Sequence, residues 1–401
     1  MSVTALGLVP NDEDRSAAPR STPRKRARST FIAVNAFDLV GAAVAGFSIT
    51  ILISRLTALS GLIGLFFLAM GLFLVTYTVL VSLREDGVAV RDAVMTVFLA
   101  CAALVAFGAL TLVIVYTIWR GLAALRHINF YDHDLSSAGP TSPLTKGGVA
   151  HALVGTLWQV GIALVLSAPL GILTAVYLDQ SRSRFSNFVR TVVNAMTALP
   201  SILAGLFIYA FWILTLGFQF SGLAAGLALT VMMLPYIVRT SDLVLRLVPT
   251  ELREASEALG APRWRTVWHV VLPTARSGLV TSVILGLARG IGEIAPVLLV
   301  AGYTTYMNAD PLHEPQVSLP LVAFKLVASG IPTYAERGYG AAALLLLLIL
   351  ILFIIARVIG GFGPGHMSAR QRRRAQRVSK RYLARIKSSI GPDAAAPGGI
   401  Q

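Results

Sequence analysis

The chain has 401 residues, of which 55% are hydrophobic and only 13% are charged. This composition excludes an ordinary soluble globular protein and predicts an all-α, polytopic membrane protein. The net charge of +15 lies mostly in the tails, since residues 1–30 hold six Lys or Arg against three acids and residues 361–401 hold nine against one. We predict no nucleic-acid binding, because neither a folded reader nor interleaved aromatic residues accompany these charges.

Both basic tails are expected on the cytoplasmic side of the membrane, by the positive-inside rule. The runs Arg24–Arg28 and Arg370–Arg381 are either solvated topological signals or sites for anionic membrane lipid. Residues 1–30 and 388–401 are expected to be disordered. No cleavable signal peptide is recognised, because about thirty polar residues precede the first apolar run. The first span should therefore stay in the mature protein.

Apolar runs long enough for a helix to cross a bilayer, about 20 residues each, recur along the chain. We predict about eight transmembrane helices, near residues 33–54, 58–82, 92–118, 150–178, 189–215, 219–239, 272–302 and 340–360. An even number places both tails on the same side. The apolar segment 317–335 is interrupted by Lys325, Gly330 and prolines, so we expect an interfacial helix or a short re-entrant piece there.

The connections between these runs alternate in their expected side. Loops 83–91, 179–188 and 240–271 are expected in the cytosol, and each contains arginine. The connections expected outside also contain some basic residues, so the charge distribution is a bias rather than a strict count. These outer connections are 55–57, 119–149, 216–218 and 303–339.

Nothing in the sequence predicts catalytic chemistry. The single cysteine, Cys101, lies in an apolar run, so it forms no intramolecular disulfide and is interpreted as a packing residue. No Walker-type phosphate loop is present, and the six histidines are scattered. We therefore expect no metal, no cofactor and no enzymatic activity in this chain.

A polar stretch, Glu251–Pro273, interrupts the apolar sequence between the sixth and seventh runs. Pro249 and Thr250 favour a helix start, and Gly260 supplies a stop. A helix of about 11 residues is too short to be stable alone in water, so it needs a partner surface. Its small side chains, such as Ala255, permit close approach.

The same stretch follows the pattern E-A-A-x-x-x-G with a later apolar residue and proline, carried here by Glu254, Ala255, Ser256, Gly260, Leu272 and Pro273. This pattern resembles the signature loop of ABC importer permeases. The resemblance implies a coupling helix that docks into a groove of a partner ATPase subunit. Ser256 replaces one small residue of the pattern with another, which should fit. The alternative interpretation is a solvated amphipathic helix.

The resemblance extends over residues 147–360. Segments 147–178, 198–209, 234–249 and 287–302 together look like the phosphate-specific pair of ABC importer permeases, and the chain is most similar to the PstA family within that pair. The family plan has six spans, which implies a permease domain over residues 92–362, with a coupling loop at 240–271. Residues 31–91 are then an additional N-terminal transmembrane hairpin, and 363–401 a basic cytoplasmic tail.

Two opposite charges lie inside the seventh run. Arg289 and Glu293 are spaced i and i+4, so on a continuous helix they share a face and can pair. A guanidinium suits a phosphate-like oxyanion, and the resemblance implies that both residues belong to the translocation region. We expect Arg289 to contact phosphate in transit, while Glu293 holds its side chain and keeps anion binding weak. The alternative is a structural salt bridge that never touches substrate.

Small residues repeat every fourth position beside this pair, at Gly278, Ser282, Gly286 and Gly290. Such a face lets another helix approach closely. We therefore expect Arg289 and Glu293 at the interface between two permease subunits.

Four other polar residues at depth are candidates for the substrate path: Thr156, Gln159, Asn194 and Ser201. Polar residues at such positions are more often in interhelical hydrogen bonds, which is the alternative interpretation of each. The resemblance implies an ATP-driven phosphate importer whose partners are two cytosolic ATPase subunits that bind ATP, a second, PstC-like permease subunit, and an extracytoplasmic phosphate-binding protein. Alternatives are a permease for sulfate, molybdate or phosphonate, or a secondary transporter or channel that needs no ATPase. The expected location is the cell inner (plasma) membrane.

Overall fold

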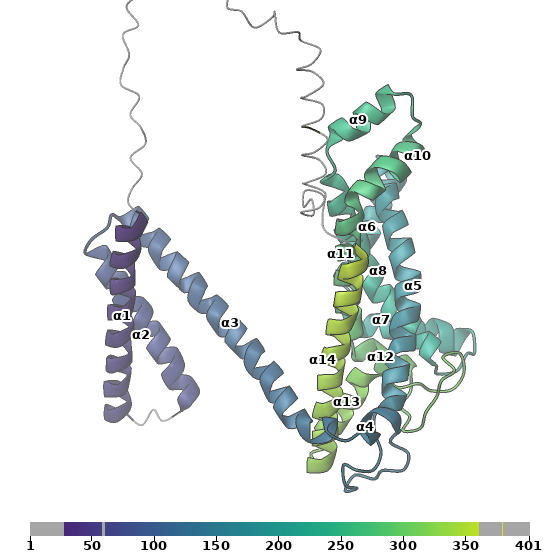
Figure 1. Ribbon diagram of the computed structural model, residues 1–401, viewed down its shortest axis with the longest axis horizontal. Coiled ribbons are helices and arrows are strands. Elements are labelled where there is room, and N and C mark those ends of the chain that lie inside the picture. The colour runs from purple at the N-terminus through teal and green to yellow at the C-terminus, as the bar shows by residue number, and fades with distance from the viewer. Residues whose placement is uncertain (1–27, 58–60, 361–378, 380–401) are drawn as a thin grey trace, which may run out of the picture. The chain divides into compact units, whose positions relative to one another are not determined.

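The computed structural model describes residues 28–57, 61–360 and 379. Most of both tails, for which we predicted disorder or a basic cytoplasmic extension, lies outside these residues. All regular elements in the described ranges are helices, which confirms the all-α prediction (Figure 1). The chain divides into two compact units, residues 1–112 and 113–401, and each unit is described by itself.

In unit 1 the first two helices form an antiparallel hairpin. Gly46 lets them approach closely, since a Cβ built there would lie 2.8 Å from the backbone nitrogen of Phe73. At one end of the hairpin, Arg84 pairs with the buried Asp38 at 3.0 Å. Close packing and an ion pair thus hold the hairpin. The helices of this unit are α1 (Arg28–Leu56), α2 (Leu62–Ser82) and the first part of α3 (Gly87–Leu125).

Unit 2 contains the end of α3 and all later elements. They are α4 (Asn129–Asp132), α5 (Ala150–Gln180), α6 (Arg184–Thr197), α7 (Ser201–Ile208), the π-helix η2 (Tyr209–Thr215), α8 (Gly222–Arg246), α9 (Thr250–Ala258), α10 (Arg263–Thr266), the π-helix η3 (Val267–Val271), α11 (Leu272–Ile291), α12 (Ala295–Val300), α13 (Leu319–Ala328) and α14 (Pro332–Gly360). We call the end that carries α9 and α10 the α9 end, and the opposite end, which carries α4 and α13, the α13 end (Figure 1).

Helix α8 is the centre of unit 2, and α5 packs along it in the same direction. A Cβ built on Gly226 of α8 would lie 2.8 Å from Ile162 Cγ2, and one built on Gly171 of α5 would lie 2.7 Å from Ile237 Cγ2. Residue numbers at the contacts therefore increase along both helices in the same direction, so α5 and α8 are parallel. Because α5 and α8 are parallel, the segment between them must return from the α9 end to the α13 end.

The predicted fifth span makes this return as a bent pair of helices. The structure bends this predicted span, 189–215, because α6 and the segment Ser201–Thr215 meet at an angle of 107°. Pro200 lacks an N–H group and disfavours helical geometry in the residue before it, so the helix stops there. The described residues contain seven helices long and apolar enough to cross a membrane, or eight crossings if the bent pair is counted as one span.

The predicted seventh span, 272–302, is also interrupted. Its helical segment starts earlier, at Arg263, and ends at Ile291. Gly292 follows the last turn of α11, and Pro296 lies in the first turn of the separate helix α12. A glycine after a helix and a proline at the start of the next are the usual signals for such a break.

The small residues of α11 pack within the chain. Cβ atoms built on three of its glycines would meet side chains of α8, in the pairs Gly278 with Val244, Gly286 with Ile237 and Gly290 with Met233. The predicted close helix contact is confirmed, but the approaching helix is α8 of the same chain. The repeat therefore gives no support for a subunit interface at this face.

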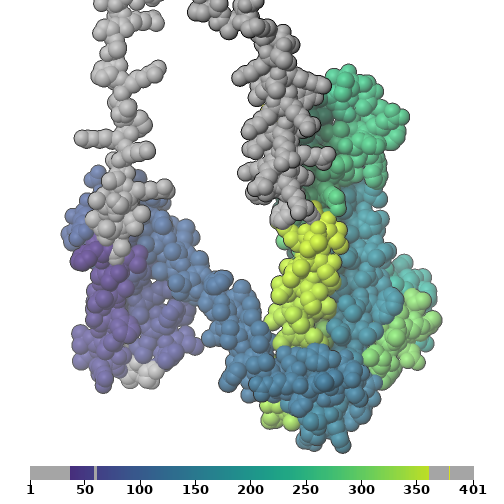
Figure 2. Space-filling model, in the orientation of Figure 1, coloured from purple at the N-terminus to yellow at the C-terminus, as the bar shows by residue number. Residues whose placement is uncertain are grey.

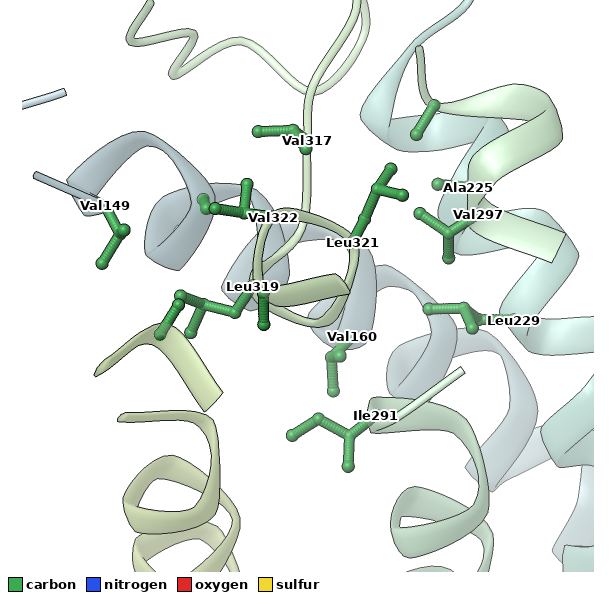
Figure 3. Close-up of a cluster of buried hydrophobic side chains, with 14 of the residues drawn as sticks. Val149, Val160, Ala225, Leu229, Ile291, Val297, Val317, Leu319, Leu321 and Val322 are labelled. Atoms are coloured by element: carbon green, nitrogen blue, oxygen red, sulfur yellow. The ribbon is translucent and has the colours of Figure 1, made fainter. Parts of the chain in front are cut away.

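The interrupted segment 317–335 contains the short helix α13. Its residues Leu319, Leu321 and Val322 are fully buried. Figure 3 shows them among side chains of other elements, including Val160 of α5 and Ile291 of α11. Helix α13 has only 10 residues, which confirms the prediction that the segment 317–335 is too broken to span. The apolar residues of α13 close the core at the α13 end.

Loops at the α13 end are tied together by hydrogen bonds. The Asp134 carboxylate accepts from the Ser136 hydroxyl at 2.6 Å and from Met307 N at 3.0 Å. The hydrogen bond from the Ser136 hydroxyl, together with those from the backbone N–H groups of Met307 and Ser136, holds the pKa of Asp134 below its ordinary value. The fully buried Arg337 donates to the carbonyl oxygens of Ser142, Pro143 and Lys146. These contacts order the connections around α13.

Gly155 provides a test of this packing, because a Cβ there would meet the backbone oxygen of Val317. We expect Gly155→Ala to lower the free energy of unfolding by about 1–3 kcal/mol, as overpacking does. The matched control is Gly161→Ala on the same helix, where nothing lies within 4 Å of the added carbon. Thermal unfolding of the detergent-solubilised protein measures both. Equal stability of the two variants would contradict the close approach of α5 to residue 317.

Candidate coupling and translocation sites

The polar stretch forms the helix that its sequence predicts. Helix α9 runs from Thr250 to Ala258, directly after Pro249. Gly260 has a φ of +82°, its N–H donates to Glu257 O at 2.9 Å, and Ala261 N donates to Ser256 O at 3.2 Å. These two bonds are the Schellman arrangement, which glycine adopts most readily. The predicted stop at Gly260 is confirmed.

One arginine attaches α9 to the ends of two long helices. The Arg253 guanidinium donates to the Asp179 carboxylate at the end of α5, with a shortest distance of 2.7 Å. It also donates to Leu245 O at the end of α8, at 3.0 Å. The Asp179 side chain is only 8% exposed, so this ion pair is shielded from solvent. A force applied to α9 is therefore passed to both α5 and α8.

The opposite face of α9 is open. Glu254, Ala255 and Glu257 are exposed, and Leu259 is 89% exposed, although it is apolar. Figure 2 shows this segment, in green, projecting at one end of unit 2. Ser256 faces inward, since its hydroxyl lies 2.9 Å from the Thr266 hydroxyl of α10. The residues of the signature pattern thus divide into an exposed face and an attached face.

The later part of the pattern joins α9 to the membrane span. Leu272 and Pro273 form the first turn of α11. The π-helix η3 lies immediately before them, and α10 before that. The helical path from residue 263 to residue 291 is therefore continuous, and it connects α9 to the region of Arg289.

Arg289 and Glu293 contact each other, as their spacing predicts. Glu293, however, lies beyond the last turn of α11, in the break before α12. The Glu293 side chain is 11% exposed and that of Arg289 is 39% exposed. The guanidinium carbon of Arg289 also lies 5.7 Å from the centre of the Tyr236 ring, a cation–π distance. Arg289 is thus held on two sides and remains partly open.

Thr156 and Gln159 hold the segment that leads into α13. The Thr156 hydroxyl accepts from Leu319 N at 2.7 Å, and Gln159 Nε2 donates to Gln316 O at 2.6 Å. Both side chains are 1% exposed. The structure therefore shows both side chains in buried hydrogen bonds that join α5 to the first residue of α13, for Thr156, and to the loop before α13, for Gln159.

Asn194 and Ser201 lie on either side of the bend between α6 and α7. Asn194 is exposed near the end of α6, and Ser201 starts α7 and is half-buried. Helix α7 packs on α12, since a Cβ built on Gly205 would lie 2.6 Å from Pro296 Cα. The two interrupted helices therefore meet, but no described contact joins either polar residue to Arg289.

Three contributors to these sites were missed by the sequence reading: Asp179, Arg253 and Tyr236. Asp179 and Tyr236 lie far along the chain from the residues they contact, and no local pattern distinguishes them. Arg253 lies inside the signature stretch, yet its role depends on where α5 ends. Among the described residues, no group of three or more His, Cys, Asp or Glu side chains is arranged to hold a metal ion.

Comparison with known proteins identifies related sequences. The family described as "Binding-protein-dependent transport system inner membrane component" matches residues 167–362. "Phosphate transport system permease protein PstA 1" of Mycobacterium tuberculosis (strain ATCC 25618 / H37Rv) is 41% identical over 257 residues, which are 64% of this chain and 83% of the relative. The PstA of Mycobacterium leprae (strain TN) is 40% identical over 259 residues, 64% of this chain and 84% of the relative.

A solved structure also matches part of the chain. It is an inward-facing MetNI methionine ABC transporter, 25% identical, with a TM-score of 0.40, covering 53% of this chain and 91% of the transporter chain.

The attachment of α9 can be tested with Arg253→Gln. We expect local destabilisation of about 1–3 kcal/mol, because Asp179 loses its charged partner while remaining buried. Hydrogen exchange of residues 250–258 should accelerate, and Arg263→Gln, which changes an exposed arginine of α10, should leave it unchanged. If exchange in Arg253→Gln stays as slow as in the parent protein, the ion pair does not hold α9.

Proposed function

We propose that this chain, which belongs to the PstA family of ABC importer permeases, forms the path for inorganic phosphate through the membrane as one permease subunit. The observation that carries the proposal is the match to mycobacterial phosphate permeases over most of their length. The family match, over residues 167–362, includes α9, the first turn of α11 and the pair Arg289–Glu293. The chain therefore carries both the coupling segment and the charged residues that the proposal needs.

Permeases of this family work with ATPase subunits, a further permease and a binding protein. For this chain we propose two cytosolic ATPase subunits, a PstC-like second permease and an extracytoplasmic binding protein that delivers phosphate. The sequence contains no Walker-type phosphate loop, which supports ATP binding by the partner ATPases alone. On this proposal, the chain needs no cofactor and catalyses no reaction of its own.

The α9 end would face the cytosol. This orientation places loops 179–188 and 240–271 of unit 2, with their arginines, on the side favoured by the positive-inside rule. Eight crossings would then put both termini in the cytosol, in the cell inner (plasma) membrane. The exposed face of α9 would lie in a groove of an ATPase subunit, and closure of the ATPase dimer on ATP binding would push on α9.

The attachments of α9 supply a route for this motion. Arg253 passes it to the ends of α5 and α8, and α10 and η3 lead into α11. Packed helices move as rigid bodies. The resulting movement of α8 and α11 would change the surroundings of Arg289, which lies between Tyr236 and Glu293. Alternating access would follow from two arrangements of these helices.

Arg289 is suited to a passing oxyanion, because its planar group offers several donors in a fixed geometry. Glu293 would keep the binding weak, since a carboxylate competes with the anion for the same guanidinium. Interrupted helices support this location for the path, because such breaks form the substrate sites of many transporters. The breaks at residues 198–200 and 292–294 lie in helices that contact each other through α7 and α12.

Phosphate uptake by variants of Arg289 tests the path. We expect Arg289→Ala to reduce uptake about 10- to 100-fold, the loss of one charge-assisted contact, and Arg289→Lys to retain part of it. Glu293→Gln should lower the KM, since the competing carboxylate is removed. Arg357→Ala, at an exposed position of α14, is the control.

Competition by sulfate, molybdate and phosphonate in the same assay measures specificity. Preferred uptake of another oxyanion would overturn the phosphate assignment. Unchanged uptake in both Arg289 variants, with normal assembly, would refute the role of Arg289 while leaving that assignment intact.

Charge reversal on α9 tests the coupling site. Glu254→Lys should lower both ATPase association and uptake, by about tenfold or more, because a reversed charge at an interface costs several kcal/mol. Glu85→Lys makes the same change at an exposed position of unit 1 and should have no effect. Co-purification of the ATPase with each variant gives the comparison. Normal ATPase binding by Glu254→Lys would exclude this face as the docking site.

A further inference from the structure

A pocket that Arg289 does not line lies where the ends of α5 and α8 meet the start of α6, and it shares Asp179 with the attachment of α9. Its volume is about 420 Å³, within the range of about 300–1,000 Å³ typical of small-molecule sites. We call it the α6 pocket. The lining residues used below are Asp179, Arg182, Ser186, Asn187, Arg190 and Arg246.

The carboxylates near the pocket are already paired. Asp242, 10% exposed at its side chain, accepts from Arg190 at 2.7 Å and lies 3.1 Å from Arg246 through the same oxygen. Asp179 is paired with Arg253. Two guanidinium groups thus share one carboxylate at the wall of the pocket, which leaves a positive charge there.

Arg182 adds a further positive charge at the rim. It is exposed and lines the pocket. Arg246, whose side chain is 55% exposed, reaches the same space from α8. With Asp179 and Asp242 neutralised by their partners, the groups facing the pocket carry a net positive charge. Guanidinium groups in such an arrangement bind phosphate oxygens in a bidentate manner.

The start of α6 contributes to the same surface. Ser183 caps the helix by accepting from Ser186 N at 3.1 Å, and Asn187 lies in the next turn. The positive end of a 14-residue helix favours an anion. The backbone dipole of α6 and the charges of the arginines therefore both favour an anion in the pocket.

An apolar face runs along α6 beside the pocket. Phe185 and Phe188 are 63% and 61% exposed, and Val192 is 39% exposed. Their spacing puts them on one side of the helix, while Ser186, Arg190 and Val193 turn toward the protein. A short helix with an apolar face and arginines at its edge is typical of one lying at a membrane surface. Acyl chains could thus cover the aromatic side chains while a head group reaches the arginines.

We propose that the α6 pocket binds a phosphate group on the cytosolic side of the membrane, carried by an anionic lipid head group or present as free inorganic phosphate. The cytosolic location of the pocket is the one part of this proposal that rests on the proposed function. The binding itself depends on Arg182 and Arg246, and it is separate from the path at Arg289.

The test uses the assembled transporter in nanodiscs. In the lipid arm, native mass spectrometry measures retention of phosphatidylglycerol against phosphatidylcholine. In the second arm, nanodiscs of neutral lipid are titrated with labelled inorganic phosphate in the Arg289→Ala background, so that the translocation path does not contribute. Each arm compares Arg182→Gln and Arg246→Gln with Arg184→Gln, an exposed neighbour that does not line the pocket.

We expect binding in at least one arm to weaken about fivefold for each pocket arginine replaced, and to be unaffected by Arg184→Gln. Loss in the lipid arm identifies a lipid head group, and loss in the second arm identifies free phosphate. The proposal is overturned if neither ligand binds, or if the Arg184 variant weakens binding as much as the pocket variants. Because Arg289 is changed only as a background, failure here leaves the transport assignment unaffected.

Discussion

The architecture of unit 2 depends on glycines that let α5 and α11 pack at close range against α8. Ile237 of α8 is fully buried between Gly171 of α5 and Gly286 of α11. Lipid tails are as apolar as leucine, so helices in a bilayer gain little from burying apolar surface and rely on close packing. A larger residue at either glycine would push the helices apart. The positions of Tyr236 and Leu245, which lie on the same helix as Ile237, depend on this contact.

Helix α8 carries groups that serve both candidate sites. Tyr236, beside the tightly packed Ile237, lies against Arg289, and Leu245 near the end of the helix accepts from Arg253 of α9. A single rigid element therefore links the coupling helix to the charged pair. The parallel course of α5 and α8 brings both of their ends to α9, and the one guanidinium of Arg253 can reach both.

Local patterns in the sequence predicted the all-α class, most of the spans and the start and stop of α9, because apolar runs, proline and glycine act through nearby residues. A run such as 189–215 has the same composition whether it is straight or bent, so composition could not show the angle of 107° at Pro200. The partner of the small-residue face on α11 and the contacts of Tyr236 and Asp179 depend on tertiary packing. Composition also could not show that Thr156 and Gln159 tie α5 to the segment before α13.

The bent pair α6–α7 also has a consequence for biogenesis. A helix interrupted at Pro200 leaves backbone groups without regular partners, and the hydrocarbon core cannot supply them. Such a segment is a poor independent substrate for membrane insertion, unlike α5 before it. Its packing partners, α8 and α12, are synthesised later. The segment between α5 and α8 should therefore reach its final depth only after translation has passed residue 300, so this part of the protein is completed out of chain order.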